Sequence, residues 1–208
     1  MRAWRVGKFG DYHQELSLSE VPDPVADGSN AVIEVKATGV NFADILNIAG
    51  QYQIKAPFPF SPGMEAAGVV VQAGPESPYK IGDRVVTVNV VGGCAGRAIA
   101  TEFGSYPIPA EMSFAQAAAF TINYQTGHFS ILRRGRLKAG ETALVHAGAS
   151  GVGTAAIQLC KAQGATVIAT ASSAEKLDVC RRCGADHVIN YKDGDFVPAV
   201  RESTQGRG

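Results

Sequence analysis

Apolar and polar residues alternate along much of the first hundred positions with the two-residue period of β-strands. Residues 31–37 alternate in this way, which is typical of a strand with one buried face. Residues 66–71 and 84–88 are rich in valine and lie between glycine, proline and aspartate residues, which also favours strands. The pattern therefore predicts that residues 1–120 form a domain built mainly from β-strands.

The pattern changes near residue 113. Ser113 and Gln116 form a capping box that predicts a helix start, and a second helix is predicted over residues 124–133. Strands and helices then alternate. Strands are predicted over residues 142–147, 166–170 and 185–190. Helices are predicted over residues 152–163, over 172–184, where Ser172 and Glu175 form a capping box and Gly184 ends the helix, and around 196–201. This alternation is typical of a parallel sheet with right-handed crossovers. Residues 121–208 are therefore predicted to form part of a doubly wound α/β domain.

A glycine-rich turn joins the first strand and helix of that second domain. Its residues are Gly148, Ala149, Ser150, Gly151, Val152 and Gly153, and Ser150 stands where the motif G-x-G-x-x-G has its middle glycine. A pyrophosphate must approach backbone N–H groups at a helix N-terminus, and a side chain in the turn would obstruct it. A strand, this turn and a helix in succession predict that these six residues bind a dinucleotide.

The overall charge narrows the classes of partner. Nineteen basic and nineteen acidic residues balance, so nothing in the charge indicates a nucleic-acid groove or an anionic membrane surface. No apolar run has the length of a membrane span, and residues 1–5 lack the apolar core of a signal peptide. We therefore expect a soluble, cytoplasmic protein with neither nucleic acid nor membrane as a partner.

Two other interpretations of these motifs, a metal or redox site and a serine hydrolase, are disfavoured. Cys180 and Cys183 form a single C-x-x-C pair without further metal ligands nearby, inside a helical pattern that ends at Gly184, so packing explains them better than zinc or redox chemistry. Ser150 resembles the serine of a G-x-S-x-G hydrolase elbow, but Val152 replaces the final glycine. His146 also precedes this serine by only four residues, whereas elbow enzymes carry their catalytic histidine downstream.

Several short segments together resemble the medium-chain dehydrogenase/reductase superfamily and, within it, the zinc-independent quinone oxidoreductases. They follow the family order along the whole chain, and they are residues 39–44, 50–52, 62–68, 82–85, 117–119, Thr126, the glycine turn and residues 184–186. The resemblance implies an α/β protein with a GroES-like β domain over residues 1–120 and a partial Rossmann domain over residues 121–208. It also implies a nicotinamide cofactor and hydride transfer.

The resemblance assigns roles to individual residues. It implies that Asn41, Asp44 and Tyr52 line the place where the nicotinamide and the acceptor meet, and that Thr126 contacts the carboxamide. Tyr52 is the candidate proton donor to the reduced oxygen, with solvent as the alternative. In the zinc-dependent relatives the position of Asn41 resembles a cysteine ligand and that of Met64 a histidine ligand. An amide and a thioether do not replace these zinc ligands, so no metal is expected.

The end of the second Rossmann strand indicates which nicotinamide cofactor binds. An NAD enzyme usually places an acidic residue there to hold the ribose 2′-hydroxyl, about 20 residues beyond the glycine turn. This chain has Ala171, followed by Ser172 and Ser173, and then Lys176. Two hydroxyls and a cation suit a 2′-phosphate, which predicts NADPH. The resemblance places Tyr191 near the adenosine.

The acceptor is predicted only as a class. A quinone or another α,β-unsaturated carbonyl compound is expected as the small-molecule substrate. An enoyl-thioester reductase and a relative that binds NADPH without turnover remain alternatives. The family sheet has the strand order 3-2-1-4-5-6, of which this chain supplies three strands. We therefore expect a C-terminally truncated chain with weak NADPH binding and little activity alone, in which the homodimer implied for the full-length family would lack its pairing edge.

Overall fold

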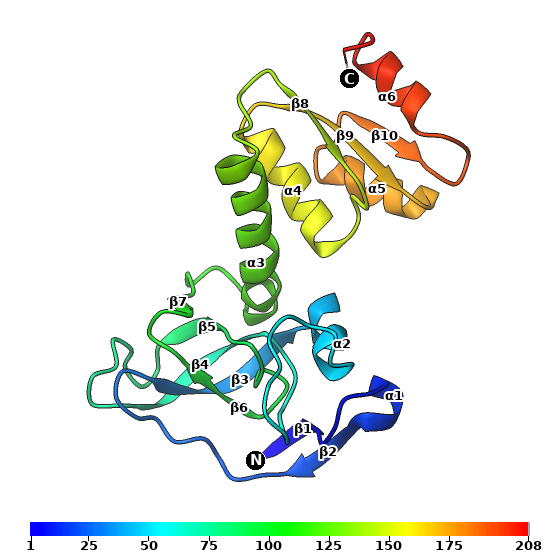
Figure 1. Cartoon of the computed structure of the whole chain (residues 1–208). Coiled ribbons are helices and arrows are strands. Elements are labelled where there is room, and N and C mark those ends of the chain that lie inside the picture. Colours follow the sequence, from blue (N-terminus) through cyan, green and yellow to red (C-terminus); the bar gives the residue numbers. More distant parts are fainter. Residues whose placement is uncertain (208) are drawn as a thin grey trace. The chain divides into compact units, whose positions relative to one another are not determined.

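The computed structural model describes residues 1–207, and the chain divides into two compact units (Figure 1). The first unit is Met1–Thr121, and the second begins at Ile122. The junction falls within helix α3 (Phe114–Gly127). No helix among residues 1–207 has the length and apolar character needed to cross a membrane.

The first unit is built on an antiparallel five-stranded sheet with the order β6-β3-β4-β5-β7. Its strands are β3 (Ala31–Gly39), β4 (Glu65–Ala73), β5 (Arg84–Val88), β6 (Arg97–Ala100) and β7 (Ser105–Pro107). The three strands predicted from the alternating pattern are confirmed by β3, β4 and β5. Ile33, Val70 and Val85, one from each of these strands, are fully buried in one core of this unit.

Smaller elements complete the first unit. An antiparallel pair, β1 (Arg2–Val6) and β2 (Leu16–Glu20), flanks the four-residue helix α1 (Tyr12–Glu15). Helix α2 (Phe42–Ile48) directly follows β3, and Asn41 is its N-cap residue. The alternating pattern predicted neither this pair nor α2, because both are short and half exposed.

The second unit contains a parallel three-stranded sheet with the order β10-β9-β8. Its elements are β8 (Thr142–Val145), α4 (Gly151–Ala162), β9 (Thr166–Ala171), α5 (Ala174–Arg182), β10 (His187–Asn190) and α6 (Val197–Ser203). Helices α4 and α5 contact β9 and each other, and their buried side chains Ile157, Cys160 and Cys180 share a core with Val167 and Ala169. The predicted parallel sheet, its first three strands in the order 3-2-1, is confirmed.

The helix prediction over residues 124–133 was wrong in one respect. Helix α3 does not end before residue 124, because the backbone of Gly127 is itself helical (φ −61°, ψ −48°) and the chain continues into the π-helix η1 (His128–Arg134). The wide turn of η1 shows in the bond from the Gly135 N–H to the Ser130 carbonyl, five residues back. One continuous helical segment therefore replaces the two predicted helices.

The second capping box was also misplaced by one residue. Ser173, rather than Ser172, is the N-cap of α5, since its backbone is extended and its side chain accepts the N–H of Lys176. The capping box at Ser113 is confirmed, because its N–H donates to the Gln116 side chain and the Gln116 N–H donates to its hydroxyl. Because Ser173 caps the helix, the Ser172 side chain is not used as the cap.

Candidate functional site

The turn between β8 and α4 brings backbone segments into close contact. Ala147 leaves β8 with a left-handed backbone (φ 51°), which ends the strand two residues earlier than predicted. A Cβ atom at Gly153 would lie 2.8 Å from Cα of Gly148 and closer still to the Ala147 carbonyl oxygen. A Cβ atom at Gly148 would lie 2.8 Å from Sγ of Cys180. Both glycines are therefore required by close approach rather than by their own φ angles.

Ser150 has a structural use in this turn. It is the N-cap residue of α4, and its hydroxyl accepts the N–H of Gly153 at 3.1 Å. A middle glycine could not make this bond, so the departure from the glycine motif supplies the cap of the helix.

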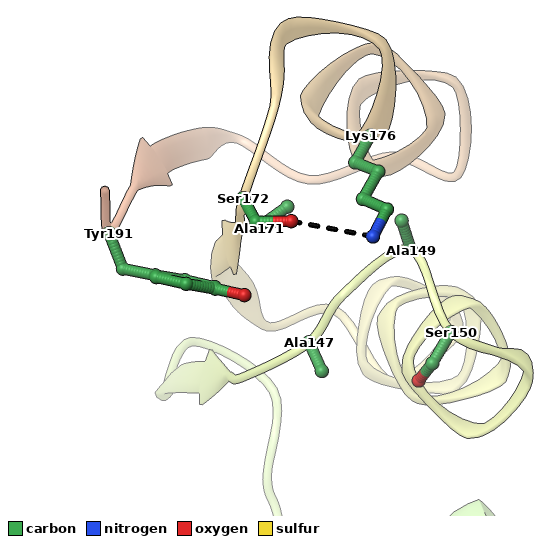
Figure 2. A pocket seen from close by; sticks show the side chains of 7 residues that line it. All are labelled: Ala147, Ala149, Ser150, Ala171, Ser172, Lys176 and Tyr191. Carbon is green, nitrogen blue, oxygen red and sulfur yellow. Dashed lines mark hydrogen bonds between the residues drawn. The ribbon is translucent and has the colours of Figure 1, made fainter. Parts of the chain in front are cut away.

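A cleft of about 140 Å³ opens beside the turn, at the carboxyl ends of β9 and β10. Figure 2 shows Lys176, from the first turn of α5, reaching across one side, while the ring of Tyr191 lies along the other. Nζ of Lys176 donates to Oγ of Ser172 at 3.4 Å (Figure 2). The seven residues that line the cleft are Ala147, Ala149, Ser150, Ala171, Ser172, Lys176 and Tyr191. One of them is a cation and none is acidic, so the cleft suits an anionic group.

Ser173 does not line this cleft, although the sequence grouped it with Ser172 and Lys176. Its hydroxyl caps α5 instead. The first acidic residue after β9, Glu175, is also held at this helix start, where a hydrogen bond with the Ser173 side chain lowers the pKa of its carboxyl. The Glu175 carboxylate is thus held at the start of α5 and does not line the cleft.

The remaining residues predicted for the second unit are Gly151, Val152 and Thr126. Gly151 packs on the Asn123 side chain, since a Cβ at Gly151 would lie 2.8 Å from its Oδ1. Val152 is exposed to solvent in the first turn of α4. Thr126 is exposed in the last turn of α3, and its carbonyl accepts the Ser130 hydroxyl at 2.7 Å. The structure therefore brings the glycine turn together with Ser172, Lys176 and Tyr191, and it places Thr126 on a different element.

In the first unit, Asn41 and Asp44 form a hydrogen-bonded network with Glu65 and Gly63. The Asn41 N–H donates to Oδ2 of Asp44 at 2.8 Å, and Nδ2 of Asn41 donates to Oε1 of Glu65 at 3.0 Å. The N–H of Gly63 donates to Oδ1 of Asp44 at 3.2 Å. Both carboxyl groups are buried, with Asp44 5% and Glu65 1% exposed. Glu65 lies in the segment 62–68 that carries the family resemblance, but no pattern in the sequence indicates its contact with Asn41.

Burial dominates the electrostatics of this network. Desolvation raises the pKa of Asp44, although backbone N–H groups of Asn41, Gly63 and Met64 act in the opposite direction. Burial, together with the nearby Asp44 carboxylate, also raises the pKa of the Cys94 thiol to about 11. Both oxygens of Asp44 are engaged by backbone donors, so its carboxyl holds the loop and the start of α2 in place.

Tyr52 lies in the loop after α2, and its backbone N–H donates to the Leu46 carbonyl at 3.2 Å. Its side chain is half-buried, and no hydrogen bond to its phenol occurs within residues 1–207. The hydroxyl is thus uncommitted. Over the same residues, no group of three histidine, cysteine, aspartate or glutamate side chains is arranged to hold a metal ion.

Comparisons with known proteins agree with this architecture. Residues 27–126 match the family model of the alcohol dehydrogenase GroES-like domain, and residues 151–208 match that of the zinc-binding dehydrogenases. The quinone oxidoreductase of Sus scrofa is 35% identical over 210 residues, which cover 100% of this chain and 64% of that protein. The chain therefore spans about two thirds of the length of this curated relative.

Two solved structures are similar over the whole chain. A probable oxidoreductase from Mycobacterium abscessus is 41% identical with a TM-score of 0.93, covering 100% of this chain and 67% of that one. The quinone oxidoreductase of Escherichia coli, solved in complex with NADPH, is 31% identical with a TM-score of 0.90, covering 100% of this chain and 64% of that one.

Proposed function

This chain belongs to the medium-chain dehydrogenase/reductase superfamily, and we propose that the protein is an NADPH-dependent oxidoreductase acting on a quinone or another α,β-unsaturated carbonyl compound. The observation that carries the proposal is the cleft beside the glycine turn, where Lys176 and Ser172 face Tyr191 without a carboxylate. The names of the pig and Escherichia coli relatives support the substrate class, and the NADPH complex of the latter supports the cofactor.

The residues of the second unit fit this cofactor. The close approach at Gly148 and Gly153 holds the start of α4 against the end of β8, and the backbone N–H groups at this helix start can bind a pyrophosphate. Lys176 and Ser172 would bind the 2′-phosphate, and Tyr191 would lie along the adenosine. When bound, NADPH supplies the hydride, while the protein positions the reacting groups and excludes water.

We assign the substrate contacts to residues of the first unit and the contact with the nicotinamide carboxamide to Thr126 of the second unit. Asn41 would bind the ligand at the reacting end, and Asp44 would keep Asn41 and the Gly63 loop in place. The uncommitted phenol of Tyr52 can donate a hydrogen bond or a proton to the acceptor oxygen. Asp44 is thus a positioning residue in this proposal.

We also propose that the reaction needs no zinc. Where zinc-dependent relatives have cysteine and histidine ligands, this chain has Asn41 and Met64. The side-chain amide of Asn41 donates a hydrogen bond directly to Glu65, so no metal ion is needed to bridge these two side chains. Acceptor polarisation therefore falls to hydrogen-bond donors of the protein and to water.

Substitution of the cleft lysine tests the proposed cofactor. In Lys176→Ala, we expect kcat/KM for NADPH to fall about ten- to hundredfold while that for NADH changes little, because one charge-assisted contact with the phosphate is lost. Lys138→Ala removes an exposed lysine of the same unit outside the cleft and should leave both values unchanged. An unaltered NADPH preference in Lys176→Ala would refute the assignment. A panel of quinones, enones and enoyl thioesters, followed by NADPH absorbance, identifies the acceptor class.

A further inference from the structure

The side chain of Asn41 is held by a buried carboxylate from another element. Nδ2 of Asn41 donates to Oε1 of Glu65 at 3.0 Å, and Glu65 is 1% exposed at the start of β4. Gly39, paired with Glu65 in the sheet, packs directly against this carboxyl, since a Cβ at Gly39 would lie 2.6 Å from Cγ of Glu65 and closer still to Oε1. The Glu65 carboxyl, which accepts the hydrogen bond from Asn41, is therefore held in place by the residues packed against it.

This contact determines which end of the amide faces Glu65. Oε1 of Glu65 is the acceptor in this bond, so the NH₂ group of Asn41 faces Glu65 and the amide oxygen Oδ1 lies on the other side. Oδ1 lies at the N-cap of α2, where the backbone N–H of Asp44 faces it in a capping box, and an amide oxygen has a second lone pair for a ligand. The main chain of Asn41 is held independently, by the bond from its N–H to Asp44. Glu65 thus orients the side-chain amide of Asn41, while Asp44 holds its main chain.

Asn41 is a partly accessible polar residue between two exposed apolar residues. Asn41 is half-buried, whereas its neighbours Val40 and Phe42 are 82% and 73% exposed. In ligand sites a few polar groups fix the orientation of a mainly apolar molecule, and an oriented amide between two exposed apolar side chains can serve in this way.

We propose that Glu65 is a positioning residue that orients the Asn41 amide, so that Asn41 presents a hydrogen-bond acceptor to the ligand. The inference rests on the proposed function, which places Asn41 at the reacting end. The ligand group bound by Asn41 is then a hydroxyl or an N–H. The carbonyl group of the substrate must be polarised by another hydrogen-bond donor, such as the Tyr52 phenol.

A charge-conserving exchange of the two side chains tests this polarity. In the double variant that combines Asn41→Asp with Glu65→Gln, the new amide at position 65 can donate to the new carboxylate at position 41, which still presents an oxygen to the ligand. Asn41→Asp alone places two carboxylates in contact, and Glu65→Gln alone permits either orientation of the Asn41 amide. We expect kcat/KM to fall at least about tenfold in each single variant, chiefly through kcat, and to recover in the double variant to within roughly threefold of wild type.

Two measurements that do not depend on turnover accompany the kinetics. NADPH affinity in all four proteins should show the same loss and recovery, and the side-chain amide protons of Asn41, observed by NMR without ligand, should shift in Glu65→Gln. A double variant no better than the worse single variant, in kinetics and in NADPH affinity, would overturn the proposal. Absence of any NADPH binding by the wild type would instead contradict the proposed function, while the NMR shift, recorded without ligand, would still report on the contact between Glu65 and Asn41.

Discussion

A Cβ atom at Gly153 would lie 2.8 Å from Cα of Gly148, so that the two glycines bring the first turn of α4 against the end of β8. Real Cβ contacts are rarely this short, and the opposing atoms belong to the backbone, which cannot rotate away as a side chain can. The shape of the turn therefore depends on the absence of a side chain at Gly153.

Gly153→Ala should displace the turn. We expect NADPH affinity to fall at least about tenfold and stability to fall by about 1–3 kcal/mol, because the added methyl overpacks the contact with Gly148 and Ala147. Fluorescence titration with NADPH and urea denaturation measure the two effects. Gly7→Ala is the matched control, because no atom lies within 4 Å of a Cβ built there. Equal NADPH affinity in the two variants would show that the turn does not bind the cofactor.

Removal of the Asp44 carboxyl should destabilise the first unit. Asp44→Ala leaves the N–H groups of Asn41 and Gly63 without their acceptor, and we expect a loss of about 1–3 kcal/mol in the free energy of unfolding. Asp44→Asn keeps one acceptor oxygen and should recover part of this loss. Urea denaturation of both variants measures the difference, with exposed Glu76→Gln as the control. If Asp44→Ala were as stable as the control, the carboxyl would have no positioning role.

Cys94 should react slowly with thiol reagents at neutral pH. The thiolate is the reactive form, and a pKa of about 11 leaves only about one thiolate in a thousand at pH 8. The alkylation rate of Cys94 in the folded protein should therefore rise about tenfold for each pH unit between pH 8 and 10. Residue-resolved mass spectrometry after timed iodoacetamide exposure measures it, and a plateau below pH 9 would contradict the raised pKa.

Activity should be independent of zinc. Prolonged treatment with a chelator should leave NADPH-dependent turnover unchanged, and elemental analysis should find far less than one zinc per chain, because Asn41 and Met64 replace a thiolate and an imidazole. Asn41→Gln, which also offers no zinc ligand, should bind no more zinc than wild type. Stoichiometric zinc that is lost together with activity would contradict this prediction.

Much of the second unit follows from local sequence. The strands and helices between residues 142 and 203 were predicted in the correct order, because their period and glycine stops act over a few neighbouring residues. The start of α5 was misplaced because two local signals compete there. Ser172 and Ser173 are both able to cap a helix, and only the position of α5 against β9 decides that Ser173 does so.

The sequence by itself determined the class of fold, the parallel order of the strands, the glycine turn and the lack of an acidic residue at the end of β9, because each of these depends on residue types at short spacing. The tertiary structure alone decided which side chains meet. Asn41 and Glu65 are 24 residues apart, and they touch because β3 pairs with β4 in a register that no local pattern encodes. Likewise, Tyr191 joins Lys176 across one cleft because β9 and β10 end at the same edge of the sheet. Contacts of this kind depend on strand register and packing, which the whole chain sets together.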